Sequence, residues 1–380
     1  MKFILIPDSF KGTLSSSQIC AVMDEKIKKH FPDSLTVSIP VADGGEGSVD
    51  AFITAVGGVK EYVTVKNPYF EDMESYFGLI DAGQTAVIEM ASCAGLPLVE
   101  DRKDPRLTTT YGVGQLILAA ARKGVKKIIV GLGGSSTNDG GCGAAAAVGI
   151  KFYDRDGRQF IPTGGTTADI DRIDLSGRDS LLEQVEIVTM CDIDNPMYGP
   201  AGASFIFGPQ KGADEAMVLQ LDEGIRNLSR VIAQATGTDI SQVPGTGAAG
   251  AMGAGMIAFF GSRLQMGIQT VLDTVRFDEI IGDADYILTG EGKLDSQSLR
   301  GKVVIGIAER AKKQAKSVIA VVGGADDYEI RTAYEMGVTA VFPINRLPQD
   351  FSVSRHRSQE NLAYTADNII RLIKAGQGEH

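Results

Sequence analysis

The sequence predicts an α/β protein in which the two chain ends together form a Rossmann-like domain with a parallel sheet. From Ala284 onward, apolar segments typical of buried strands alternate regularly with helical segments, which favours a doubly wound sheet. The N-terminal part shows the same alternation. The middle of the chain instead carries consecutive strand signals joined by short turns, at 62–65, 75–80 and 85–88. We therefore expect a discontinuous Rossmann-like domain at 1–62 and 277–380, and an inserted α/β domain of mixed sheet at 63–276.

Four elements are expected near the N-terminus. The apolar run between Met1 and Asp8 predicts the first strand. Ser15 and Gln18 have the spacing of a helix capping box, and apolar residues then recur every four positions, at Ile19, Met23 and Ile27. A second strand is expected at 35–41. A second helix is expected at 49–56, and it ends at the glycine pair that follows.

The later elements follow from the same patterns. An amphipathic helix is expected from Val113 to Ala120 and is closed by Gly124, and a strand is expected at 185–190. The uncharged stretch from Ile240 to Ser262 is rich in glycine, which predicts a buried loop and a close-packed helix rather than a membrane span. The last strands are expected at 286–288, 318–322 and 339–342, and the last helices at 303–313 and 359–375.

Composition and charge exclude several classes of protein. The length of 380 residues predicts two or three domains. The formal net charge of −11 argues against a nucleic-acid or membrane partner. The four cysteines lack metal-binding spacing, which indicates reduced thiols and a cytoplasmic location. The three histidines lie outside the glycine-rich motifs, so we expect neither a histidine triad nor a zinc site, and any general base should be a carboxylate.

One glycine-rich loop, at 131–143, has the composition of a phosphate-binding loop. An apolar strand signal at 128–130 precedes the loop, and the small residues at 144–148 can form a helix behind it. A helix that starts near Asn138 or Asp139 would direct free N–H groups into the loop. The alternative is a glycine-rich turn that packs a helix against a sheet. Several similar loops along the chain favour the phosphate-binding interpretation.

Lysines and carboxylates lie in these further loops. The lysines are Lys11, Lys211 and Lys293, and the carboxylates that follow strands are Asp43, Asp192, Asp194 and Asp295. Phosphoryl transfer needs anion-binding loops, positive charges, Mg²⁺ ligands and a carboxylate that accepts the proton of the acceptor hydroxyl. Each residue also has an ordinary alternative as a solvated charge, a helix cap or a turn former. Together they predict a phosphate-handling enzyme with a cleft between two domains.

Six segments, in order along nearly the whole chain, carry a resemblance to a known family. The sequence resembles the type I glycerate kinase family in Pro7 to Gly12, Val41 to Gly47, Gly131 to Gly141, Cys191 to Pro196, Phe207 to Gly212 and Thr289 to Asp295. The resemblance implies ATP-dependent phosphorylation of D-glycerate with Mg²⁺, by a cytoplasmic enzyme of two α/β domains. Bacterial members are associated with organic acid catabolism and typically form 2-phosphoglycerate. D-glycerate and ATP are thus the expected partners, and the oligomeric state is left open.

Residue chemistry then suggests roles within these segments. Asp192 is expected to be the base toward the glycerate hydroxyl, with Lys11 and Lys293 as further catalytic residues. Asp194 and Asp43 are the expected Mg²⁺ ligands. The residues expected to bind substrate or phosphate are Ser9, Asp43, Gly44, Gly45, Glu46, Gly133, Gly134, Ser135, Ser136, Asn138, Lys211 and Glu291.

Two other functions are compatible with the same loops. One is a kinase that forms 3-phosphoglycerate or acts on another small hydroxy acid or sugar acid. The other is a non-catalytic protein that binds a phosphorylated metabolite. Acceptor-dependent release of ADP separates an enzyme from a binding protein, and a panel of substrates at fixed ATP separates the kinases from one another.

Overall fold

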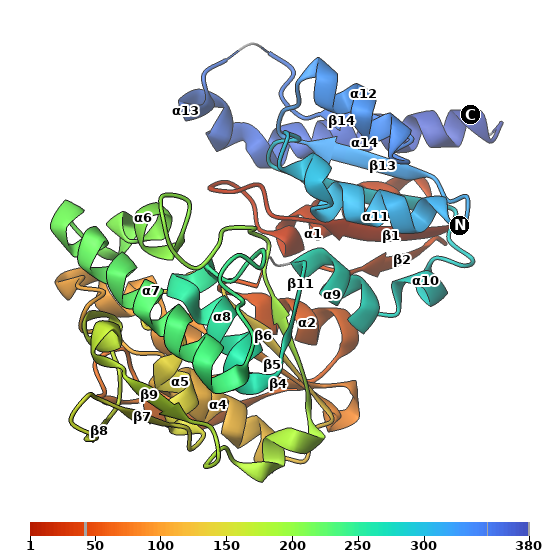
Figure 1. The fold of residues 1–380 in the computed structure, drawn as a ribbon. Coiled ribbons are helices and arrows are strands. Elements are labelled where there is room, and N and C mark those ends of the chain that lie inside the picture. Colours follow the sequence, from red (N-terminus) through yellow and green to blue (C-terminus); the bar gives the residue numbers. More distant parts are fainter. Residues whose placement is uncertain (42–43, 348, 379–380) are drawn as a thin grey trace. The chain divides into compact units, whose positions relative to one another are not determined.

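The computed structural model describes residues 1–41, 44–347 and 349–378, and the chain divides into two compact units (Figure 1). The first unit joins the two chain ends and consists of Met1–Ala42, Thr54–Val56 and Ile268–His380. The second consists of Asp43–Ile53 and Gly57–Gly267. Each unit has its own sheet.

The sheet of the first unit is five-stranded and wholly parallel, in the order β14-β13-β12-β1-β2. Its strands are β1 (Lys2–Pro7), β2 (Leu35–Ser38), β12 (Tyr286–Glu291), β13 (Val318–Val322) and β14 (Ala340–Pro343). The central strands β1, β12 and β13 are almost entirely buried, as expected for a parallel sheet with helices on both faces. The pairing of Phe3 with Tyr286 shows how the two chain ends meet in one sheet.

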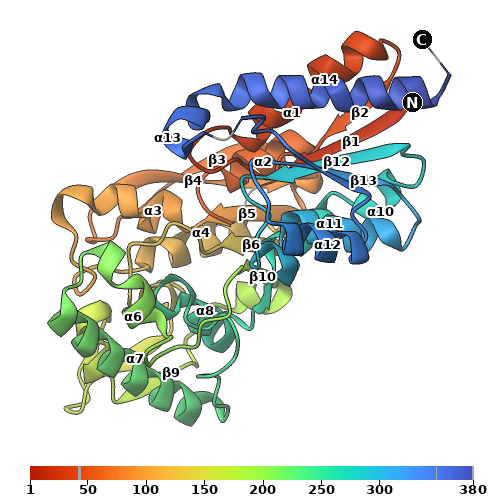
Figure 2. The same ribbon diagram turned by 90° about the horizontal axis from the view of Figure 1, so that it is seen from above.

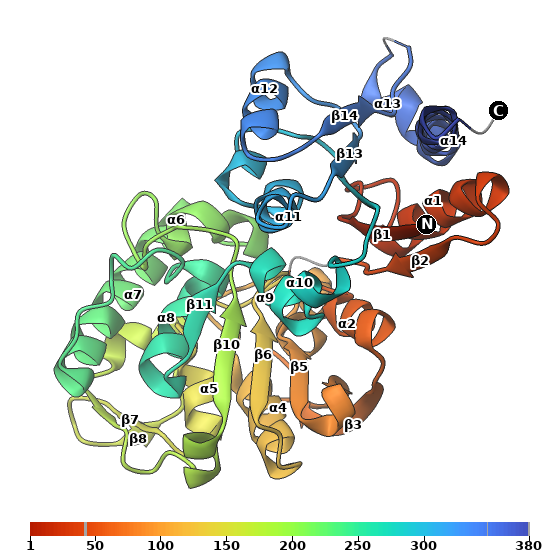
Figure 3. The same ribbon diagram turned by 90° about the vertical axis from the view of Figure 1, so that its right-hand side faces the viewer.

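Helices cover both faces of this sheet (Figure 3). On one face, α1 (Ser16–His30) packs against α14 (Ser358–Gly376), and both contribute to a core with the apolar side chains of β1 and β13. On the other face lie α11 (Val303–Lys312) and α12 (Asp327–Glu335). Three shorter helices complete the set: α9 (Gly267–Thr274), α10 (Phe277–Ile280) and α13 (Phe351–Ser354).

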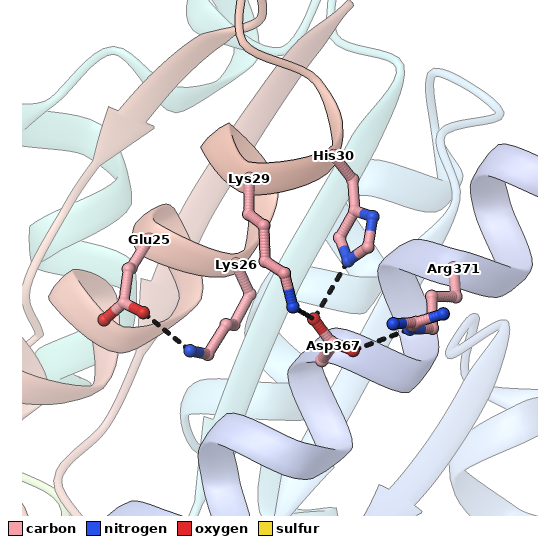
Figure 4. Close-up of polar contacts among 6 residues, drawn as sticks. All are labelled: Glu25, Lys26, Lys29, His30, Asp367 and Arg371. Atoms are coloured by element: carbon pink, nitrogen blue, oxygen red, sulfur yellow. Dashed lines mark hydrogen bonds and ion pairs between the residues drawn. The ribbon is translucent and has the colours of Figure 1, made fainter.

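The predicted start of α1 is confirmed in detail. The Ser15 hydroxyl accepts the Gln18 N–H at 3.2 Å, and the Gln18 side chain accepts the Ser15 N–H at 2.8 Å. This reciprocal pair satisfies two N–H groups that the helix itself leaves open. Helix α1 also meets α14 through a charged cluster, in which Asp367 accepts from Lys29, His30 and Arg371 (Figure 4). The two helices lie side by side (Figure 2).

The second unit contains a six-stranded mixed sheet in the order β11-β10-β6-β5-β4-β3. Its strands are β3 (Val59–Lys66), β4 (Asp72–Ile80), β5 (Thr85–Glu89), β6 (Lys127–Gly131), β10 (Glu186–Met190) and β11 (Arg263–Gln265). The strands β5, β6, β10 and β11 are parallel (Figure 3). Strand β4 pairs antiparallel with both β3 and β5. A small antiparallel sheet adds β7 (Lys151–Tyr153), β8 (Gln159–Phe160) and β9 (Arg172–Asp174).

The remaining helices are α2 (Ser48–Val56), α3 (Ala91–Ala94), α4 (Tyr111–Arg122), α5 (Cys142–Ala147), α6 (Ala203–Phe207), α7 (Glu215–Thr236) and α8 (Ala248–Phe260). Short 3₁₀ turns lie at Asp81–Gly83, Leu96–Arg102, Gly164–Asp169, Ser180–Gln184, Pro209–Lys211, Ser298–Arg300 and Arg355–Arg357. The sheet of the second unit packs with α4, α5, α7 and α8 in one large apolar core. Across the described residues, no helix is both long and apolar enough to cross a membrane.

The predicted fold class is confirmed: a Rossmann-like parallel sheet formed by both chain ends, with an inserted α/β unit of mixed sheet. The domain boundaries near 62 and 277 stay a prediction. Two local expectations were wrong. The second strand ends at Ser38 rather than at 41, and the helix after the long glycine-rich loop begins at Cys142 rather than near Asn138.

Candidate functional site

The carboxyl edge of the parallel sheet in the first unit holds a cavity of about 580 Å³. From β1 the chain moves outward to β2, whereas from β12 it moves in the opposite direction to β13 and β14. The loops after β1 and β12 therefore diverge above two adjacent strands. Such a switch point is where open α/β sheets bind their ligands. The cavity is lined by the segments that follow β1, β12, β13 and β14, so it has the position expected of a binding site.

Four of the predicted site residues line this cavity together: Ser9, Lys11, Glu291 and Lys293. The segment after β1 is held close to β12, because the Asp8 N–H donates to the Gly290 carbonyl at 2.8 Å. The segment after β12 forms a tight turn. In that turn the Asp295 carboxylate accepts the N–H groups of Gln297 at 2.9 Å and of Ser298 at 3.2 Å.

Glu291 is the most unusual side chain in the cavity. It ends β12, is only 8% exposed, and its Oε1 has no hydrogen-bond partner among the described residues. Burial raises the pKa of Glu291 to about 7, and the nearby carboxylates of Asp8 and Asp295 add to this rise. The Ser298 hydroxyl and the Lys302 charge act in the opposite direction. A buried carboxyl oxygen without a partner is costly, so this atom is suited to receive a ligand's donor.

Positive groups surround the same cavity. Besides Lys11 and Lys293, it is lined by Lys302, whose Nζ donates to Gln297 Oε1 at 3.0 Å. Lys302 is also the N-cap of α11, and within the described chain no side chain caps this helix start. Ser358, the first residue of α14, lines the cavity too. Lysines and open helix N-termini both favour the binding of anions.

The sequence-based prediction missed several lining residues: Gln297, Lys302, Asn345, Phe351, Ser354 and Ser358. Lys302 carries a signal that could have been used, because it lies directly before the predicted helix at 303–313. Gln297 lies two residues after the predicted segment Thr289 to Asp295, and the remaining four come from segments without a glycine-rich motif. Only the parallel order of β12, β13 and β14 brings these segments to the same edge of the sheet.

The predicted phosphate loop lies in the second unit, at the carboxyl end of β6. It packs tightly against Gly44 and Gly45: the Gly133 N–H donates to the Gly44 carbonyl at 3.0 Å, and a Cβ at Gly133 would lie 2.5 Å from the Gly45 Cα. The Ser136 N–H donates to the Ala94 carbonyl at 2.9 Å. Close backbone packing thus explains Gly133, and Gly44, Gly45 and Gly133 lie together, whereas Ser136 is bonded to Ala94.

The start of α5 is satisfied within the protein by Asp139. This carboxylate accepts the N–H groups of Gly141 and Gly143 at 3.2 Å each, and the N–H of Thr110 at 2.7 Å. Burial raises the pKa of Asp139, and these hydrogen bonds act against the rise. Asp139 was not among the predicted site residues, and here it holds the loop and the helix start in place.

Lys211 reaches into the same loop from the 3₁₀ turn Pro209–Lys211. It is 2% exposed, and its Nζ donates to the Ser135 hydroxyl at 3.1 Å and to the Thr137 carbonyl at 2.6 Å. Burial lowers the pKa of Lys211 to about 7, while the Asp139 carboxylate opposes this change. Asn138 is wholly buried and donates to the Ser204 hydroxyl at 3.1 Å. Lys211 and Ser135 therefore belong to one buried polar cluster, Asn138 is bonded instead to Ser204, and Gly134 lies at the surface.

The predicted acidic residues lie at other places in the second unit. Asp192 follows β10, and its Oδ1 accepts the Gly267 N–H at 2.7 Å at the start of α9. Asp194 and Glu46 are exposed. Asp43 lies outside the described residues. At the start of α2 the Val49 N–H donates at 2.5 Å to the carboxylate of the buried Glu89 from β5.

Comparison with known proteins then places the chain in a family. The model of the glycerate kinase family matches residues 3–374. The chain belongs to the glycerate kinase family. It is 41% identical to a glycerate 2-kinase of Escherichia coli K12, over 99% of each chain, and 41% identical to a glycerate kinase of Bacillus cereus, over the full length of both. A solved structure from Salmonella typhimurium LT2, provisionally named glycerate kinase 2, has a TM-score of 0.87 and 37% identity, and covers 100% of this chain and 99% of its own.

Family membership confirms the predicted enzyme class. The chain is a kinase of a small molecule, as the resemblance in its six segments implied. Neither alternative function, a kinase of another acid or a non-catalytic binding protein, is favoured by these similarities. The individual roles of the site residues stay predictions.

Proposed function

We propose that this protein transfers the γ-phosphoryl group of ATP to the 2-hydroxyl of D-glycerate and forms 2-phosphoglycerate. The observation that carries the proposal is the full-length similarity to a protein named glycerate 2-kinase. A solved structure of similar fold bears a corresponding name. A cytoplasmic location and a role in organic acid catabolism accompany this proposal, with no membrane or nucleic acid as a partner.

Chemical roles follow from the residue types. Asp192 is the proposed base that accepts the proton of the glycerate hydroxyl, and Lys11 and Lys293 neutralise charge on the phosphate groups. Both lysines line the cavity of the first unit. Lys211 acts by holding Ser135 and Thr137 in place, because its ammonium is already bonded to both residues.

Mg²⁺ is the proposed metal, with Asp194 and Asp43 as ligands. Among the described residues there is no group of three or more side chains able to hold a metal ion. Two carboxylate ligands still fit Mg²⁺, because this ion is commonly held by one or two carboxylates together with the phosphates of the substrate. When bound, the ion would neutralise charge on the transferred phosphoryl group.

The decisive experiment follows ADP formation from ATP and D-glycerate and passes the product directly to enolase. Enolase accepts 2-phosphoglycerate, so turnover without an added mutase would establish phosphorylation at the 2-position. ADP formation without enolase turnover would move the phosphate to the 3-position. If no ADP forms in response to D-glycerate, the proposal that D-glycerate is the substrate is wrong.

A further inference from the structure

We propose that the cavity of the first unit is the nucleotide site of this kinase. The base lies against Phe351, and the phosphate chain lies against Lys302 and the start of α11. This assignment rests on the proposed function, and it separates the two substrates: the cavity binds a nucleoside diphosphate or triphosphate, and D-glycerate is bound elsewhere.

The size and position of the cavity favour a nucleotide over a three-carbon acid. Its volume is about 580 Å³, within the range of pockets that enclose a ligand of many heavy atoms. It lies at the switch point between β1 and β12, the place at which doubly wound sheets bind nucleotides and related ligands. A three-carbon acid would leave most of this space to water.

One end of the cavity is suited to phosphates. Lys302 both lines the cavity and forms the N-cap of α11, a helix of 10 residues whose start has no side-chain cap within the described chain. The backbone N–H groups of the first turn are therefore available together with the lysine charge. Lys11 and Lys293 add two more positive charges to the lining.

The cavity also contains an aromatic surface suited to a base. Phe351, the first residue of α13, lines the cavity and is 62% exposed. A phenyl ring left open to solvent beside a polar cavity can stack on a flat heterocycle, and such stacking stabilises a bound base. D-glycerate has no flat apolar face and gains nothing from this ring.

Glu291 gives an independent sign that a ligand belongs here. Its side chain lines the cavity and is 8% exposed, and in the described structure its Oε1 lacks a partner. A ligand with hydroxyl or amino donors would supply the missing hydrogen bond. The ribose and base of a nucleotide carry such donors.

The test uses the absence of tryptophan from the sequence. Phe351→Trp introduces the only tryptophan of the chain, a fluorescent reporter that can be excited selectively, at the proposed base position. We expect ADP alone to quench its emission saturably, while D-glycerate alone and inorganic tripolyphosphate leave it unchanged. Tyr328→Trp is the matched control, because Tyr328 is an exposed aromatic residue of the same unit that does not line the cavity. Its emission should not respond to ADP.

Calorimetry on two further variants completes the test. Phe351→Ala should weaken ADP binding about tenfold and leave tripolyphosphate binding unchanged, whereas Lys302→Ala should weaken both by about tenfold. The KM for D-glycerate should stay the same in both variants. The proposal is overturned if both variants bind ADP as the wild type does, or if the KM for D-glycerate rises instead. Because ADP binding is measured without turnover, failure of the glycerate reaction would refute the proposed function and leave this result standing.

Discussion

At the scale of single residues, the chain is distinguished by ionisable side chains that are almost fully buried. Glu89, Asp139, Lys211 and Glu291 are each 8% exposed or less. Three of them are satisfied by protein partners, whereas Glu291 keeps one oxygen without a partner in the described chain. The charge of Glu291 is therefore expected to affect the stability of the protein.

The stability of the protein should depend on pH through Glu291. Its pKa of about 7 lies above the ordinary value of 4.5, so the folded state holds this proton more tightly than the unfolded state. Its contribution to stability is therefore present at acid pH and is lost as the pH rises to about 7. The difference in the free energy of unfolding between Glu291→Gln and the wild type should grow in favour of the variant by about 2 kcal/mol from pH 5.5 to pH 8. Urea denaturation measures this difference.

The control for this prediction is Glu309→Gln, which removes an exposed carboxylate from α11 of the same unit. The two substitutions change the net charge equally. Equal pH dependence in both variants would contradict a special contribution from Glu291.

Asp192→Asn tests the proposed base. The asparagine side chain keeps an oxygen that can accept the Gly267 N–H, so the start of α9 should be retained. Loss of proton acceptance should lower kcat by about 10²–10⁴-fold, with a smaller change in the KM for D-glycerate. Steady-state kinetics give this split, and circular dichroism checks the fold. A variant with near-normal turnover would show that Asp192 is not the base.

At the scale of elements, close backbone packing explains part of the glycine content. Gly131, at the end of β6, lies against Gly44, and a Cβ at position 131 would lie 2.3 Å from the Gly44 carbonyl oxygen. Gly131→Ala should therefore separate the two segments and lower the free energy of unfolding by about 1–3 kcal/mol. Thermal unfolding measures the loss. Gly376→Ala, which places a Cβ in open space at the end of α14, is the control. Equal stability of the two variants would contradict the packing argument.

A second prediction at this scale concerns the stability contributed by the charged contact between α1 and α14. Hydrogen bonds from Arg371, His30 and Lys29 hold the pKa of Asp367 well below its usual range, so the charged carboxylate stabilises the fold at neutral pH and loses this effect progressively as the pH falls below the ordinary value of 3.8. Asp367→Asn should lower the free energy of unfolding at pH 7 by about 1–2 kcal/mol, and less in high salt.

Figure 4 also contains the control for this prediction. Glu25 pairs with its neighbour Lys26 on α1, and this ion pair does not join two helices. Exposed pairs of this kind contribute little. We expect Glu25→Gln to change the unfolding midpoint hardly at all. If Glu25→Gln costs as much stability as Asp367→Asn, the link between the helices is not the cause.

At the scale of the whole molecule, the proposed reaction predicts a strict requirement for a divalent cation. Chelation with EDTA should abolish ADP formation from ATP and D-glycerate, and added Mg²⁺ should restore it. Asp194→Asn should raise the Mg²⁺ concentration needed for half-maximal rate, because one proposed ligand is lost. Full activity in EDTA would exclude the metal, and an unchanged Mg²⁺ requirement in Asp194→Asn would exclude that ligand.

The sequence by itself determined the fold class, because alternation of apolar strands with amphipathic helices is a local pattern. The capping box at Ser15 and Gln18 and the helix at Ser358–Gly376 were visible for the same reason. The family was also visible, because its six segments are contiguous in the chain. These signals need no knowledge of distant contacts.

Only the tertiary structure decided which residues meet. Glu291, Lys302 and Phe351 come together because β12, β13 and β14 run parallel and end at the same edge of one sheet. Whether a carboxylate in a glycine-rich loop is exposed, like Glu46, or buried, like Asp139, depends equally on segments far away in the sequence. Burial and the supply of hydrogen-bond partners set the pKa of each group, and both are properties of the packed fold rather than of the local sequence.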